Sequence, residues 1–135
     1  MRGMHHWGAS LVVVMIFLHT LRVFFTGSYK KPRELNWVVG VLLFGVILGL
    51  SFTGYLLPWD MKALFATVVG IEIAASVPVI GEAIKILLAG DSSILGAQTL
   101  TRFFAIHVFF LPAALLGLLG AHFIMIRRQG ISGPL

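Results

Sequence analysis

Apolar residues dominate three long stretches of the chain, and most polar residues lie between them. The three stretches run from about residue 8 to 25, from 37 to 57 and from 103 to 126. Each is close to the roughly 20 residues that an α-helix needs to cross the hydrocarbon core of a bilayer. The second stretch, WVVGVLLFGVILGLSFTGYLL, contains no charged residue. The pattern predicts an all-α protein with three transmembrane helices.

The segment from 58 to 102 separates the second and third predicted spans. Its apolar runs, LFATVVGIEIAASVPVI and GEAIKILLAG, are interrupted by Pro78 and Gly81, and neither is convincing as a span. We expect short helices lying at the outer membrane interface. Residues 1–135 are interpreted as one transmembrane domain with this segment as its outer loop.

The composition supports a membrane protein, with 59% hydrophobic and 11% charged residues. Soluble domains carry roughly a quarter charged residues. The net charge of +5 comes from basic residues beside apolar spans, which indicates topology and lipid contact and disfavours nucleic-acid binding. The chain has no cysteine, so disulfides, thiolate metal sites and thioether-linked haem are excluded for these residues.

Charge asymmetry predicts the orientation in the membrane. The 26–36 link and the C-terminal tail carry five basic residues against one acid, namely Lys30, Lys31, Arg33, Arg127 and Arg128 against Glu34. This side should therefore face the cytoplasm, which places the N-terminus outside. No signal peptide precedes the first span. We therefore expect a preceding span that belongs to the natural protein and is missing here or supplied separately.

Two pairs of histidines lie on the first and third spans at nearly equal spacing. His5 and His19 are fourteen residues apart, and His107 and His122 are fifteen residues apart. Either interval is close to four helical turns, so each pair projects from nearly one face, with a rise of about 21 to 22 Å. That spacing excludes a single metal centre of the HExxH type, whose histidines are one turn apart. It predicts two centres at two depths.

The first and third spans should run parallel, because one span separates them. His5 then lies level with His107, and His19 lies level with His122. Each level offers two imidazoles across a gap between helices, which is the ligation that a b-type haem needs for electron transfer. We predict two haem b groups, with these four histidines as the iron ligands.

Glycines and arginines near these positions are further candidates for haem contact. Gly40 and Gly54, fourteen residues apart in the second span, would let a ring edge approach the backbone. Arg22, one turn beyond His19, and Arg2, three residues before His5, could pair with haem propionates. Alternatively, the arginines are ordinary membrane anchors, the glycines are typical of membrane helices, and a histidine can be a hydrogen-bonding core residue. Pro112 predicts a kink in the third span. The histidine interval of this span is one residue longer than that of the first span, and the extra residue could compensate for the kink.

Several longer motifs resemble cytochrome b of the quinol–cytochrome c reductase and cytochrome bf complexes over nearly the whole chain. They are HHWGAS with His19 and Arg22, then GSYKKPREL, TGYLLPWD, AQTLTRFFAIH and IRRQGISGPL. The ending ISGPL and the fifteen-residue interval resemble the short, split form, closest to the menaquinol-using complexes of Gram-positive bacteria. The family's first helix is missing from these residues.

The resemblance implies an electron-transfer subunit of an oxidoreductase that is inactive as an isolated chain. His5 with His107 would ligate an outer, low-potential haem, and His19 with His122 an inner, high-potential haem. Quinol would be oxidised at an outer pocket, with one electron passing to an iron–sulfur protein and the other through both haems to an inner quinone. The implied partners are quinol and quinone, a companion membrane subunit carrying the remaining helices, a Rieske iron–sulfur protein and a c-type cytochrome, or plastocyanin, in a dimeric complex. The implied location is a bacterial cell membrane, or alternatively a thylakoid membrane.

Two other functions remain open from the residues. The chain could be a dihaem membrane anchor of a dehydrogenase, in which quinone meets haem without an iron–sulfur partner. It could also be a haem-free assembly or transport subunit whose histidines form hydrogen bonds or relay protons. In each interpretation the chain is a multi-pass membrane protein, and no side chain is assigned a catalytic role.

Overall fold

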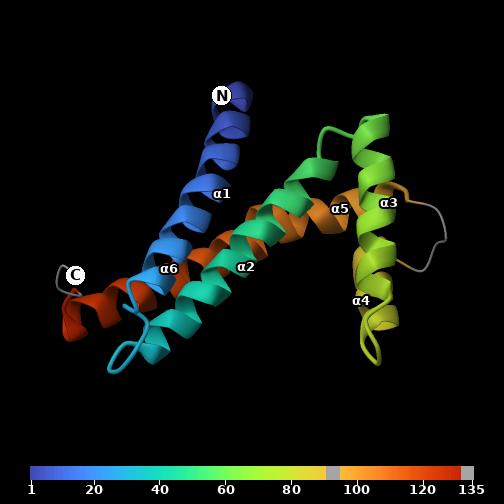
Figure 1. The fold of residues 1–135 in the computed structure, drawn as a ribbon. Helices are drawn as coiled ribbons and strands as arrows, with labels where there is room; N and C mark the ends of the chain where they lie inside the picture. The colour runs from blue at the N-terminus through green and yellow to red at the C-terminus, as the bar shows by residue number, and fades with distance from the viewer. Residues whose placement is uncertain (91–94, 132–135) are drawn as a thin grey trace. The chain divides into compact units, whose positions relative to one another are not determined.

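The computed structural model describes residues 1–90 and 95–131, and the regular structure in these ranges is entirely helical (Figure 1). The elements are α1 (Arg2–Phe25), α2 (Glu34–Leu56), α3 (Met61–Ala75), α4 (Gly81–Ala89), α5 (Ala97–Ala105), the π-helical segment η1 (Ile106–Phe110) and α6 (Leu111–Gln129). Within the described ranges, three segments are long and apolar enough to cross a membrane: Arg2–Phe25, Glu34–Leu56 and Ala97–Gln129. The all-α fold with three spans is therefore confirmed, and the chain is a multi-pass membrane protein. The end of the ISGPL motif and part of the predicted outer loop lie outside the described residues.

The chain divides into two compact units. The first unit holds residues 1–49 and 113–135, and the second holds residues 50–112. The boundaries fall inside α2 and α6, so each unit contains part of these helices.

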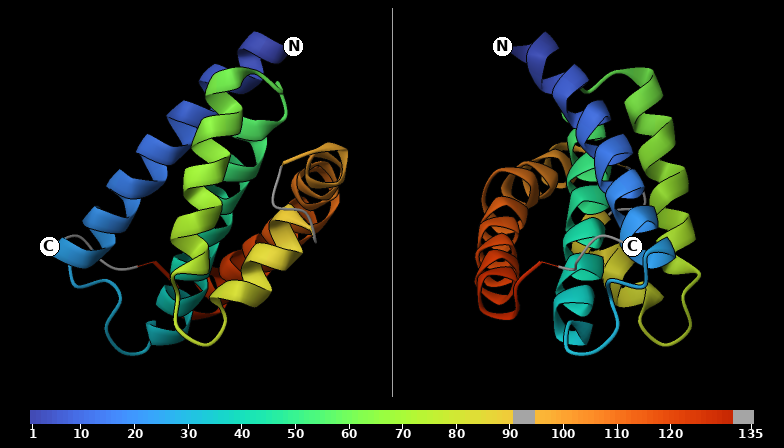
Figure 2. Two further views of the ribbon diagram at one scale, coloured as in Figure 1. Left: turned by 90° about the vertical axis from the view of Figure 1, so that its right-hand side faces the viewer. Right: turned by 60° about the vertical axis from the view of Figure 1, so that its left-hand side comes forward.

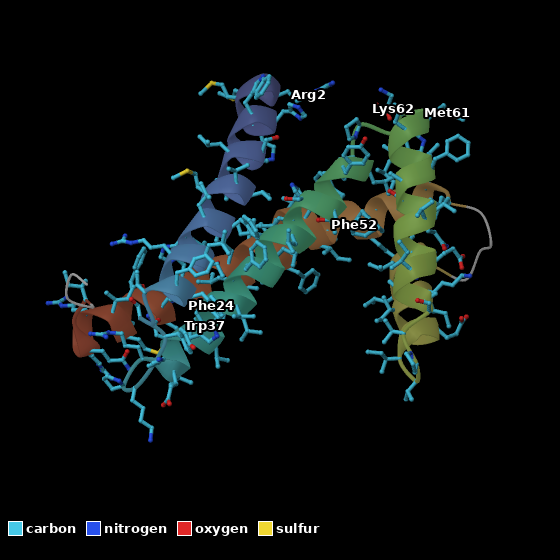
Figure 3. All side chains as sticks on the ribbon, viewed as in Figure 1. Arg2, Phe24, Trp37, Phe52, Met61 and Lys62 are labelled. Carbon is cyan, nitrogen blue, oxygen red and sulfur yellow. The ribbon has the colours of Figure 1, made fainter. Side chains whose placement is uncertain are left out.

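The first unit presents most of its apolar side chains on its surface. Within α1, which is described throughout, no residue is buried. Such a surface suits a bilayer, where lipid tails are as apolar as the side chains they contact. Near the 26–33 link, Tyr29 stacks on Phe24 with ring centroids 5.8 Å apart, and its centroid lies 5.4 Å from that of Trp37. Figure 3 labels Phe24 at the end of α1 and Trp37 at the start of α2. The aromatic group fixes the link against the ends of α1 and α2.

The second unit has a small apolar core. Its buried members come from four helices and are Leu56, Ala63, Ile71, Ala89 and Phe103. The helices α3 and α4 pack against each other and are joined by a short connection, residues 76–80 (Figure 2). Asp60 caps α3 by accepting a hydrogen bond from the Ala63 amide at 2.8 Å. These contacts support the two short helices α3 and α4 between the second and third spans, as the sequence predicts.

The N-terminal half of the third span holds the C-terminal end of α4. The Thr99 hydroxyl, which is fully buried, donates to the carbonyl oxygen of Ala89 at 2.9 Å. The Arg102 guanidinium donates to the carbonyl oxygen of Leu87 at 2.9 Å, and also to that of Ile86. A helix C-terminus has carbonyl groups without partners in the helix, and a cation there is favourable. The first part of the AQTLTRFFAIH motif thus has a structural role in this unit.

A π-helical segment interrupts the third span next to Pro112. Proline lacks an N–H and cannot donate to the carbonyl of Val108, so the α-helical pattern cannot continue unchanged. The segment Ile106–Phe110 contains His107. A π-helical turn holds more residues than an α-helical turn. The π-helical turn therefore accommodates extra chain length, which is what the one additional residue between His107 and His122 requires.

Candidate functional site

The histidines on α1 lie on one uninterrupted helix. α1 runs from Arg2 to Phe25 and includes both His5 and His19. Their separation of fourteen residues therefore corresponds to a rise of about 21 Å along the helix axis. His122 lies in α6, and His107 lies in η1.

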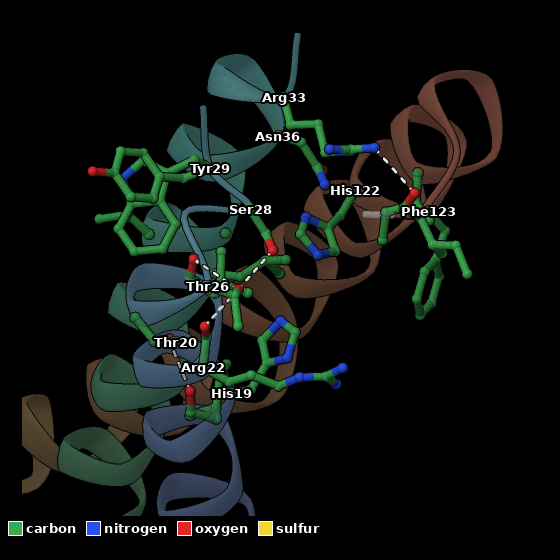
Figure 4. A pocket seen from close by; sticks show the side chains of 18 of the residues that line it. His19, Thr20, Arg22, Thr26, Ser28, Tyr29, Arg33, Asn36, His122 and Phe123 are labelled. Atoms are coloured by element: carbon green, nitrogen blue, oxygen red, sulfur yellow. Dashed lines mark hydrogen bonds between the residues drawn. The ribbon is translucent and has the colours of Figure 1, made fainter. Parts of the chain in front are cut away.

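The first unit contains a cavity of about 750 Å³ between α1, the 26–33 link, α2 and α6. Ligand pockets in proteins usually measure about 300 to 1,000 Å³, so a large planar cofactor can be accommodated. The lining includes His19 and Arg22 from α1 and His122 from α6 (Figure 4). Gly40 from α2 also lines the cavity. The structure thus brings together four of the eight residues that the sequence singles out.

The His122 ring lies on the backbone of α2 at Gly40. A Cβ atom at Gly40 would be 3.6 Å from the Cε1 atom of His122. The Nδ1 atom of His122 is buried and has no hydrogen-bond partner among the described residues, and the same holds for the Oδ1 atom of Asn36. Leaving a buried polar atom unpaired costs about 1 to 3 kcal/mol. Two such atoms at this cavity indicate a site shaped for a bound group.

Two arginines line the same cavity. Arg22 lies beside His19 and carries the charge that an acidic group on a ligand would need (Figure 4). Arg33 donates from Nε to the carbonyl oxygen of Gly130 at 3.3 Å and from Nη2 to that of Ile131 at 3.0 Å. The planar guanidinium thereby joins the link to the end of α6. The cavity fits the donor set of a bis-histidine haem with an arginine available to a propionate.

The second unit holds His107 in a tighter arrangement. A Cβ atom at Gly54 would lie 2.7 Å from the Cε1 atom of His107, closer than real Cβ contacts, so only glycine leaves room for the ring. The hydroxyl of Thr53 lies 3.1 Å from His107 Nδ1. Gly54 thus adjoins a candidate ligand, while the predicted approach of a haem edge to Gly54 stays a prediction.

His5 and Arg2 lie in the first turns of α1 and are exposed. His5 belongs to the first unit and His107 to the second. Their pairing, and the approach of Arg2 to a propionate, stay predictions.

Sequence reasoning did not identify Thr53, Asn36 or Arg33 as residues near the candidate ligands. Thr53 directly precedes Gly54, and Asn36 lies one turn before Gly40. Polar side chains beside two candidate contact glycines in an otherwise apolar helix are a usable signal. The contact of Arg33 joins residues 97 and 98 positions apart, which no local pattern reveals.

The family model described as cytochrome b (N-terminal)/b6/petB matches residues 10–135. The chain is 81% identical over 134 residues to the menaquinol:cytochrome c reductase cytochrome b subunit of Geobacillus thermodenitrificans, and 79% identical to that of Bacillus subtilis. It is 52% identical to cytochrome b6 of Heliobacterium mobile. These alignments cover 99% of this chain and 60%, 60% and 62% of the relatives, so the chain spans about three-fifths of their length.

A solved structure titled hyperthermophilic respiratory Complex III has a similar fold. The TM-score is 0.87 at 32% identity, covering 98% of this chain and 36% of that chain. The fold, the cavity with His19 and His122, and the family match agree. The chain belongs to the cytochrome b family.

Proposed function

We propose that this chain is the electron-transfer subunit of a quinol-oxidising bc-type complex and holds two haem b groups. Membership of the cytochrome b family implies haem b binding. The observation that carries the proposal is the cavity of the first unit, where two imidazoles from different helices line one space of suitable volume. A haem held there supplies a one-electron couple.

The four histidines would hold the two haems in pairs. His19 and His122 would hold the inner group, and His5 and His107 the outer group. Ligation by two histidines would suit each haem to electron transfer and would leave it closed to oxygen binding. Gly40 and Gly54 would allow close approach to α2, and Arg22 and Arg2 would pair with propionates.

The spacing along α1 suits transfer across a membrane. His5 and His19 are separated by about 21 Å along the helix, a large part of the roughly 30 Å hydrocarbon core. Two redox centres held at these depths divide one long transfer into shorter steps. The basic residues of the 26–36 link and the C-terminal tail support an orientation with the His19 end toward the cytoplasm.

The chemistry outside this chain belongs to the whole complex. The relatives in Geobacillus and Bacillus are named menaquinol:cytochrome c reductase subunits, and this chain spans about three-fifths of them. We infer that quinol is oxidised near the outer side and quinone is reduced near the inner side, so that protons are released outside and taken up inside. A companion membrane segment, a Rieske iron–sulfur protein and a c-type cytochrome would complete a dimeric assembly in a bacterial cell membrane.

Difference spectra of the assembled complex test this assignment. His19→Ala and His122→Ala should each remove the same one of two b-type signals. His5→Ala and His107→Ala should each remove the other. His6→Ala is the matched control, because this neighbouring histidine breaks the spacing and should leave both signals.

Two results would contradict the proposal. Retention of both signals in all four variants would show that the histidines are not the ligands, and an assembled wild type without a haem spectrum would favour the assembly or transport function. Co-purification with a Rieske-type protein and a c-type cytochrome is expected. Co-purification with a dehydrogenase instead would favour the membrane-anchor function.

A further inference from the structure

The Thr53 hydroxyl contacts one nitrogen of the His107 ring, within the second unit. Oγ1 of Thr53 lies 3.1 Å from Nδ1 of His107, and Thr53 is only 4% exposed. We propose that Thr53 is a positioning residue that holds His107 in the Nδ1–H tautomer, so that Nε2 carries the lone pair for iron. The proposal rests on the proposed haem ligation by His107.

The proton count at the hydroxyl supports this tautomer. A threonine hydroxyl has one hydrogen to donate and two lone pairs to accept with. The Thr53 hydroxyl donates to the carbonyl oxygen of Leu50 at 3.3 Å. A carbonyl oxygen cannot donate in return, so the contact with His107 Nδ1 is one in which the ring N–H donates to the hydroxyl. A neutral imidazole protonated at Nδ1 has its free lone pair on Nε2.

Packing fixes the ring from a second direction. The Cε1 edge of His107 lies against Gly54, where a Cβ atom would be 2.7 Å from Cε1. The hydroxyl of Thr53 and the backbone at Gly54 thus constrain two neighbouring atoms of the same ring. Because Thr53 is buried, water has little access to replace its hydroxyl.

The two histidines of the third span differ in this respect. His122 lies near Gly40 but has a buried Nδ1 without a hydrogen-bond partner among the described residues. A hydrogen bond from the outer ring N–H to an oxygen raises the basicity of a ligating imidazole. A more basic ligand stabilises ferric over ferrous iron, so Thr53 should lower the reduction potential at the His107 centre.

Redox titration of the assembled complex, with Thr53→Val and Thr53→Ser compared, tests the role. Valine keeps nearly the same shape without the hydroxyl, and serine keeps the hydroxyl. We expect Thr53→Val to raise the midpoint potential of the haem that His107→Ala removes, through a threefold to tenfold change in its reduction equilibrium, or about 30 to 60 mV. Thr53→Ser should remain near wild type, and the other haem is the internal control. The low-spin ferric EPR signal of the same haem should change in the valine variant alone.

Several outcomes would overturn the role of Thr53. They are an unchanged potential and EPR signal in Thr53→Val, or an equal shift in Thr53→Val and Thr53→Ser. If the valine variant fails to assemble, Thr53→Ala removes the same hydroxyl with less bulk and must give the same upward shift. Failure of haem ligation itself is distinguishable, because His107→Ala would then retain both b-type signals.

Discussion

Replacing Gly54 with alanine would place a methyl group against the His107 ring. The added Cβ would lie 2.7 Å from Cε1, 3.2 Å from Nδ1 and 3.3 Å from Nε2. Carbon atoms pack best at about 3.5 to 4.0 Å, so the ring or the helix must move by about 1 Å. A shift of that size would also disturb the 3.1 Å contact between His107 and Thr53.

The expected cost follows from overpacking a close contact, which is typically about 1 to 3 kcal/mol. If this cost falls on the haem-bound state, haem affinity should decrease by about fivefold to more than a hundredfold, since each 1.4 kcal/mol is tenfold. The assay is the ratio of b-type haem to protein in the purified complex, followed by the rate of haem loss on heating. We expect Gly54→Ala to lose the signal assigned to His107 selectively.

Two comparison variants on the same helix separate packing from helix propensity. Glycine to alanine favours a helix by about 1 kcal/mol wherever there is space. At Gly45 no described atom other than the chain neighbours and the helix's own backbone lies within 4 Å of the added Cβ, so Gly45→Ala should retain both haems. Gly40→Ala should have a milder effect than Gly54→Ala, because its Cβ would be 3.6 Å from His122. Full haem content and an unchanged spectrum in Gly54→Ala would refute the reasoning.

Two further predictions concern the second unit. Thr99→Val should lower the thermal unfolding midpoint of the purified complex, because it removes the hydrogen bond to the buried carbonyl of Ala89 at a cost of about 1 to 3 kcal/mol. Thr99→Ser keeps the hydroxyl and should recover most of the loss. Equal midpoints for the wild type and both variants would contradict this prediction. The Lys85 ammonium donates to the Glu72 carboxylate at 2.8 Å, and this contact raises the pKa of Lys85 above its usual 10.5. The small stabilisation from this ion pair is present below pH 10.5 and is lost as the pH rises through the folded-state pKa of Lys85. The difference in thermal midpoint between wild type and Lys85→Gln should therefore vanish at high pH. A difference that does not depend on pH would contradict this prediction.

Much of the fold could be predicted from the sequence because the bilayer imposes it. A lipid-facing helix must be apolar over about 20 residues, so the positions of α1, α2 and the third span follow from the hydropathy pattern. The matched intervals within the histidine pairs and the glycine pair also carried information, because helical geometry converts intervals into depths. They predicted one depth for His19, His122 and Gly40. The structure brings these three residues to one cavity.

The remaining contacts depend on details that a pattern does not contain. Thr53 is one hydroxyl in an apolar helix, and its burial and its distance to His107 distinguish it from the exposed Ser51 nearby. The hydrogen bonds from Arg33 to the carbonyl oxygens after α6 join parts of the chain that are far apart in sequence. At Pro112 the sequence indicates a disturbed helix, but packing decides that the disturbance takes the form of a π-helical segment.

A high-resolution density map of the assembled complex would test the central claim most directly. The account predicts two planar haems, one with its iron between Nε2 atoms of His19 and His122, and one with its iron between those of His5 and His107. A map in which either iron is bound by another side chain, or in which the cavity between α1, α2 and α6 holds no haem, would contradict the account.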